Sequence, residues 1–128
     1  MRKQLDSINR AEQSLWRHSV ASALIVVVFN KFGIKGPHGT FTAALAHDVG
    51  KIIIGRKLRS MGVTLRSLHP DRPWVDEAEQ LGIDHGELGE SVVRMWELPH
   101  EIGVAVRHHH APHNLEPGPA QELSLIHI

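Results

Sequence analysis

The 128-residue sequence has no cysteine and no tyrosine, and aromatic residues make up only 5% of it. The lack of cysteine excludes a disulfide scaffold, a zinc finger built on thiolates and a thiol nucleophile. The chain also has no excess of charge, because 14 basic residues balance 14 acidic ones. This balance argues against a protein whose main role is to bind a nucleic-acid backbone.

Long apolar runs are missing as well. The longest extends from Val20 to Phe29 with one interruption at Ser22, whereas a membrane-spanning helix needs about 20 apolar residues. Asp6 and Glu12 precede this run, so it does not have the pattern of a secretory signal peptide. We therefore expect a cytoplasmic protein that has neither a membrane nor a nucleic acid as its partner.

Hydrophobic periodicity predicts an all-α fold, a compact bundle of about five helices. Residues 5–30 contain no glycine or proline, which predicts a long first helix whose C-terminal half is buried. Three glycines within residues 31–39 indicate a loop. Thr40 is a candidate N-cap of a second helix, which we expect to continue to about Leu58.

Three shorter helices are expected in the second half of the chain, over about residues 75–81, 85–98 and 99–110. Asp84 and Glu87 have the spacing of a capping box at the start of the second of these helices. No alternation of apolar and polar residues is visible, so we expect no strands.

Histidine is unusually abundant, with 11 residues in the chain. It is the commonest side-chain metal ligand. His47, Asp48 and Lys51 fall on one polar stripe of the second predicted helix, between apolar flanks. Burying such groups costs free energy unless they are paired or bind a metal. Two interpretations remain open, namely a metal site or a His–Asp pair with a salt bridge to the lysine.

Four further histidines are expected to point inward from other helices: His18, His85, His109 and His110. Taken singly, each is also explained as a satisfied core residue or as an exposed one. Together with His47 and Asp48 they come from four helices, and helical bundles bring such side chains to one centre. Nitrogen ligands with a carboxylate suit one or two divalent transition-metal ions.

Most other histidines have ordinary explanations. We expect His108 at the rim of the cluster. We predict solvated positions in loops or in the tail for His38, His69, His113 and His127. A basic cluster follows the polar stripe: Lys51, Arg56, Lys57, Arg59 and Arg66. Apart from Lys51, we interpret this cluster as a solvated helix end that complements the helix dipole.

Residues 44–51, with the sequence Ala-Leu-Ala-His-Asp-Val-Gly-Lys, resemble the His-Asp core motif of the HD superfamily of metal-dependent phosphohydrolases. Within this superfamily the chain is most similar to the HDOD family of bacterial signalling domains. Further segments of the family pattern occur at residues 15–20, 81–89, 96–99 and 106–112. Their order and spacing resemble those of the family over about residues 15–112.

The resemblance implies a role for each inward residue. The first set of metal ligands would be His18, His47 and Asp48, with the aspartate bridging if two ions are bound. Similarity to the HD-GYP phosphodiesterases implies that a second ion would be bound by His85, His109 and His110. The metal would be manganese, iron or zinc.

In an active member of the superfamily, metal-activated water attacks phosphorus, and the ions stabilise charge on the phosphoryl oxygens. Asp48 and Lys51 are therefore the candidate catalytic residues, the lysine as a contact for phosphate. The superfamily pattern ends with a further aspartate downstream of the paired histidines. This chain has no aspartate after Asp84, which leaves the enzymatic activity open.

A full domain of the family also begins with a further helical region. We therefore interpret residues 1–113 as the C-terminal part of an HDOD domain, truncated at both ends. A Pro-rich stretch and a poorly ordered tail are expected over residues 114–128.

Two functions follow from these expectations. The first is a bacterial signal-transduction module whose metal-binding pocket acts through a ligand, such as a nucleotide, or through another signalling protein or domain. The alternative is a metal-dependent phosphohydrolase or phosphodiesterase that acts on a nucleotide or a cyclic dinucleotide. The missing aspartate favours the first.

Overall fold

The structure, a computed structural model, describes residues 2–118, 121 and 123. Within this part of the chain it has six α-helices, one 3-10 helix and no strand, which confirms the predicted all-α class. The elements are α1 (Arg2–Lys31), α2 (Thr40–Ala46), α3 (Val49–Met61), α4 (Pro73–Leu81), α5 (His85–Met95), α6 (His100–Arg107) and the 3-10 helix η1 (Pro112–Asn114). The predicted poorly ordered tail falls mostly on residues 119, 120, 122 and 124–128, which lie outside the described residues.

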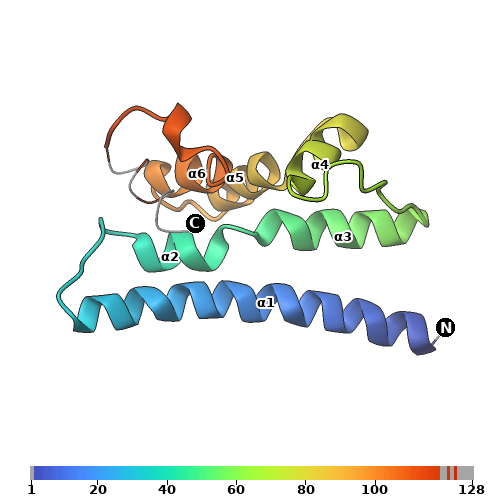
Figure 1. Ribbon diagram of the computed structural model, residues 1–128, viewed down its shortest axis with the longest axis horizontal. Coiled ribbons are helices and arrows are strands. Elements are labelled where there is room, and N and C mark those ends of the chain that lie inside the picture. Colours follow the sequence, from blue (N-terminus) through green and yellow to red (C-terminus); the bar gives the residue numbers. More distant parts are fainter. Residues whose placement is uncertain (1, 119–120, 122, 124–128) are drawn as a thin grey trace.

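The helices are arranged in layers (Figure 1). α1 lies along one side, α2 and α3 follow each other through the middle, and α4, α5 and α6 cover the opposite side. Within the described residues, every helix is too short or too polar to cross a membrane. Because the middle layer contacts both outer layers, the junction between α2 and α3 lies between α1 and α5.

The prediction of a continuous second helix is wrong. α2 ends at Ala46 and α3 begins at Val49, and Asp48 between them has φ −107° and ψ 13°. Aspartate is favoured at the position before a helix. The carboxylate of Asp48, however, makes no capping hydrogen bond to α3 and faces histidines instead. The break therefore places His47 and Asp48, both buried, between the layers.

The last two helices are shorter than predicted. α6 ends at Arg107, so the three consecutive histidines follow the helix. The Nδ1–H of His109 donates to the carbonyl oxygen of Val106 at 2.6 Å and so satisfies a carbonyl that the helix end leaves unpaired. At the start of α5 the predicted N-cap is confirmed, since the carboxylate of Asp84 accepts from the backbone N–H of Glu87 at 2.9 Å.

Glycines let α3, α5 and the end of α6 approach until their backbones touch. A Cβ atom on Gly50 would overlap the carbonyl oxygen of His85. A Cβ atom on Gly86 would lie 2.6 Å from the carbonyl oxygen of Arg107. A larger residue at either position would separate the helices, so these contacts set the distances among the histidines that the helices contribute.

α1 contacts the middle layer through a narrow strip of small residues. Ala23, which is 1% exposed, and Val26 pack against Ala44 of α2. The rest of the apolar run lies on the outer face, where Leu24 and Ile25 are 54% and 51% exposed. The predicted burial of the C-terminal half of this helix is therefore correct for one face only.

Candidate metal centre

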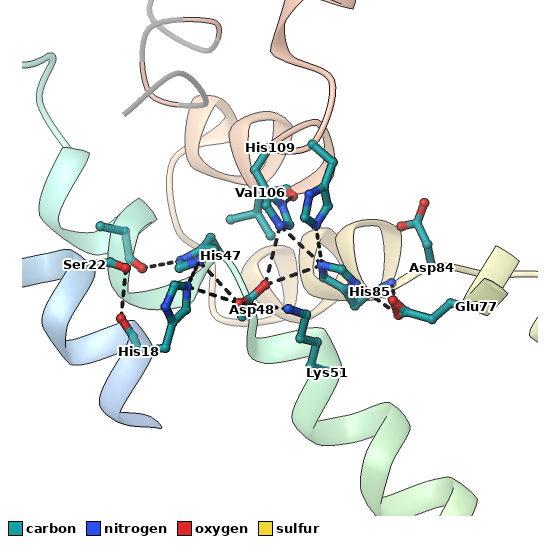
Figure 2. A network of polar contacts seen from close by, with 12 residues as sticks. His18, Ser22, His47, Asp48, Lys51, Glu77, Asp84, His85, Val106 and His109 are labelled. Carbon is teal, nitrogen blue, oxygen red and sulfur yellow. Dashed lines mark hydrogen bonds and ion pairs between the residues drawn. The ribbon is translucent and has the colours of Figure 1, made fainter. Parts of the chain in front are cut away.

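Side chains from four parts of the fold meet between the layers (Figure 2). They are His18 from α1, His47 and Asp48 from the α2–α3 junction, His85 from the start of α5, and His109 and His110 from the turn after α6. The structure thus brings together all the residues that the sequence analysis placed inward.

One half of the centre, the His18 half, consists of His18, His47 and Asp48. The Oδ2 atom of Asp48 lies 3.6 Å from Nε2 of His18 and 3.4 Å from Nε2 of His47. The two Nε2 atoms are 3.1 Å apart. Each of the three residues can therefore direct one ligand atom to a common point.

The other half, the His85 half, shares the aspartate and consists of Asp48, His85, His109 and His110. The Oδ1 atom of Asp48 lies 3.4 Å from Nε2 of His85 and 3.5 Å from Nε2 of His109. The Nε2 atom of His85 lies 3.2 Å from that of His109 and 2.9 Å from that of His110. Asp48 thus presents one oxygen to each half, as a bridging carboxylate does.

The separations between these atoms match those of ligands around a shared ion. Ligand atoms about 2.0–2.2 Å from one ion are separated by roughly 2.8–3.6 Å at octahedral or tetrahedral angles. Direct charge-assisted hydrogen bonds to a carboxylate are shorter, about 2.7–2.9 Å. The four histidine contacts of Asp48, at 3.4–3.6 Å, fall in the first range. Its Oδ1 atom is buried and has no hydrogen-bond partner among the described residues.

Backbone carbonyls orient two of the rings. The Nδ1–H of His47 donates to the carbonyl oxygen of Ala44, and the Nδ1–H of His109 to that of Val106, both at 2.6 Å. These bonds place the proton on Nδ1 and leave the Nε2 lone pair directed at the centre. Metal-ligating histidines are held in this way in most proteins.

Glu77 orients a third ring, a role that could not be predicted from the sequence. Its carboxylate accepts from the Nδ1–H of His85 at 2.5 Å and from the backbone N–H of the same residue at 3.2 Å. Glu77 is 6% exposed and His85 is 0% exposed. The two residues lie on different helices, so their contact produces no periodic pattern in the sequence. It becomes visible only in the packing of α4 against α5.

Trp74 holds His110, and it too was missed because it lies on another helix. The two rings are stacked, with centroids 3.9 Å apart and planes 11° apart. Burial, together with the neighbouring rings of His109 and His85, lowers the pKa of His110 to about 3. The His110 imidazole is therefore neutral near pH 7, the form that binds a metal.

The centre also shifts the pKa of two buried groups. Burial alone raises the pKa of the Asp48 carboxyl, but the facing imidazoles, foremost that of His109, outweigh it and hold the pKa far below 3.8. Burial lowers the pKa of His85, but the carboxylates of Asp48 and Glu77 outweigh burial and raise it above 6.5. Near pH 7 the aspartate is therefore ionised, and protons compete with a metal for His85.

The arrangement agrees with the comparison with known protein families. The family model of the HDOD domain matches residues 1–112, which include α1 to α6 and the whole centre. The chain belongs to the HDOD domain family. No curated protein and no solved structure matches this HDOD domain. The resemblance that the motifs suggested is thus confirmed for the family and for its helical fold.

Beside the centre, this HDOD domain has space for a ligand. Lys51 lies at the edge, with its Nζ atom 3.3 Å from Oδ2 of Asp48. A cavity of about 310 Å³ opens there and is also lined by Ile54 and Arg66. A second cavity, of about 230 Å³, adjoins His110. Ligand sites typically measure about 300–1,000 Å³, so the first is large enough for a small molecule.

His69 lies in a loop, as predicted, but its side chain is half-buried and paired. Its Nδ1–H donates to Asp76 at 2.8 Å, and Asp76 also accepts from the backbone N–H groups of Leu68 and His69. Burial raises the pKa of Asp76, but these hydrogen bonds outweigh it and hold the pKa below 3.8. Glu79 completes a further group with ligand-like spacing. We interpret this group as an anchor for the loop before α4, because the buried carboxylate is already paired.

Other predicted positions are mostly as expected. His38 and His113 are exposed, His108 is half-buried, and His127 lies outside the described residues. The helix end of the basic cluster is exposed at Arg56, as predicted, but two of its members also pair with an acidic residue, which was not predicted. Arg56 and Arg59 pair with Glu12 of α1, at 3.0 Å and 2.6 Å, and so connect α3 to α1.

Proposed function

We propose that this HDOD domain is a signalling module that binds a divalent metal ion at the Asp48 centre. The supporting observation is the spacing of four histidine nitrogens, 3.4–3.6 Å from the two oxygens of Asp48. This spacing is too long for charged hydrogen bonds and suits ligands of a shared ion. Nitrogen and carboxylate ligands without sulfur suit manganese, iron or zinc. One or two ions fit, because each oxygen of Asp48 faces its own set of histidines.

A bound divalent ion would supply a Lewis acid to an oxygen of the ligand. The residues of the chain orient the ligands and supply charge. His47 and His109 are oriented by backbone carbonyls, and Lys51 adds a positive charge at the open edge of the centre. Lys51 and Arg66 line the same cavity, which the carboxylates of Asp76 and Glu77 also line. Both carboxylates are already paired with histidines, so we propose that the two cations contact an anionic ligand such as a nucleotide.

The signalling part of the proposal is supported by family membership and by the outer face of α1. Val20, Leu24 and Val28 are each about half exposed on this helix. Contiguous exposed apolar patches are typical of surfaces that another protein or domain covers. We propose that the output passes through such a contact with another signalling protein or domain.

Metal content tests the metal-binding proposal. The purified chain, stripped with a chelator and then supplied with manganese, iron or zinc, is expected to retain one or two ions per chain. Asp48→Ala removes the carboxylate shared by both halves. It should weaken metal binding by at least about 100-fold, because even the loss of a residue that only orients a ligand costs up to about 100-fold. Metal at 100 times its Kd should also raise the unfolding free energy by about 2.7 kcal/mol.

Asp71→Ala changes an exposed aspartate outside the centre and is the matched control, which should keep the full metal content. Less than one ion per wild-type chain after supply of all three metals would contradict the proposal.

Hydrolysis of a phosphate ester is a second candidate function. It is favoured by Lys51, whose ammonium group lies beside the bridging carboxylate and lines a cavity that a phosphate could enter. Incubation of the metal-loaded chain with nucleotides and cyclic dinucleotides distinguishes the two functions. Metal-dependent turnover that disappears in Asp48→Ala would establish an enzyme and replace the purely regulatory function.

A further inference from the structure

The two halves of the centre differ in how their histidines are held. In the His85 half, every ring has a second contact: His85 with the Glu77 carboxylate, His109 with a backbone carbonyl, and His110 with the face of Trp74. These contacts fix the rings before any ion binds. A ligand set that is already ordered loses less entropy when it binds.

The His18 half is less well ordered. His47 is held by the carbonyl of Ala44, but the Nδ1 atom of His18 has no hydrogen-bond partner among the described residues. The His18 side chain is 57% exposed. His110 of the other half is exposed as well, but its ring is stacked on Trp74. An ion in the His18 half must therefore hold an exposed ligand that has no Nδ1 hydrogen bond, and ordering such a side chain lowers the affinity.

The charge of Glu77 increases the difference in affinity between the two halves. The Nδ1–H of His85 donates to a carboxylate, whereas the Nδ1–H groups of His47 and His109 donate to neutral carbonyl groups. A carboxylate that accepts from Nδ1–H makes the imidazole a more basic ligand at Nε2. The carboxylate of Glu77 is buried, so its charge is little screened by solvent. Its effect is largest on His85, because the hydrogen bonds and the ion pair of Glu77 with the centre go to this residue among the described ones.

We infer that the centre fills in order: a first ion binds tightly in the His85 half, and a second binds more weakly in the His18 half. Glu77 is the positioning residue that makes the halves unequal. The inference rests on the proposed metal function. It also gives the module a regulatory property, because the occupancy of the His18 half then follows the surrounding metal concentration.

Calorimetric titration of the metal-free chain with Mn²⁺ tests this order. The wild-type chain should bind in two steps whose dissociation constants differ by at least about tenfold. His18→Ala, at an exposed side chain, should lose the weaker step and keep the tighter one. Two steps of equal affinity, or loss of the tighter step in His18→Ala, would overturn the inference.

Glu77→Gln keeps the shape of the side chain and an acceptor oxygen but removes the charge. It should weaken the tighter step by about 10–100-fold and the weaker step by much less. Glu79→Gln is the matched control, a more exposed carboxylate on the same helix, and should change neither step. Equal weakening of both steps, or no change, in a Glu77→Gln chain that keeps the wild-type circular dichroism spectrum would refute the role of Glu77. The absence of any binding step in the wild type would instead overturn the proposed metal function itself.

Discussion

Asp48 and His85 are buried, whereas Leu24 and Ile25 on α1 are more than half exposed. The usual distribution of side chains is thus reversed in both regions: the centre buries charged and polar groups, and α1 presents apolar ones to solvent. The centre lies where glycines allow the helix backbones to touch. The outer face of α1, by contrast, is not covered by any other described helix (Figure 1). Burial in this domain therefore depends on where helices can approach closely, more than on the polarity of each residue.

Gly50→Ala should have the largest effect, because it acts on the close contact beneath the centre. Its Cβ would overlap the backbone carbonyl of His85, which can move only if α5 moves. We expect a loss of about 3 kcal/mol or more in unfolding free energy, the upper range for overpacking, and weaker metal binding. Urea denaturation followed by circular dichroism measures the first effect.

Gly55→Ala on the same helix is the control for this prediction. Its Cβ would meet only the far end of the Arg59 side chain, at 3.3 Å, which can shift by a few tenths of an ångström without moving the backbone. Alanine should stabilise the helix by up to about 1 kcal/mol. Equal stabilities of the two variants would show that α3 and α5 are not in backbone contact.

Ala23→Leu should have an intermediate effect, because it enlarges the inner strip of α1. Ala23 packs against Ala44 with almost no exposed surface, so three added carbon atoms must push α1 away from α2. Overpacking of this kind costs about 1–3 kcal/mol. The urea midpoint should fall with an unchanged m-value, whereas an unchanged midpoint would mean that α1 packs loosely.

Leu24→Lys, at the next position, should have the smallest effect on stability. The side chain lies on the outer face, and changes at exposed positions usually alter the unfolding free energy by less than about 0.5 kcal/mol. Urea denaturation should give a midpoint close to that of the wild type. A large loss of stability would instead mean that the outer face of α1 is covered within the single chain.

Much of the centre could be predicted from the sequence. Histidines at inward positions of separate helices, with a neighbouring aspartate, indicated one cluster, and the structure brings those residues together. The break between α2 and α3 could not be predicted, because the apolar periodicity continues through His47 and Asp48. The roles of Glu77 and Trp74 could not be predicted either. Their partners, His85 and His110, lie on other elements, so no regular spacing in the sequence relates them.

By itself, the sequence determined the helical class, the membership of the HDOD family and which polar residues face inward, because periodicity and motif order are local properties. Only the tertiary structure decided which histidines share each oxygen of Asp48 and how each ring is held. These relations depend on distances between helices, which are set where Gly50 and Gly86 let backbones meet. Helix crossings of this kind join residues far apart in the chain, so no pattern along the sequence contains them.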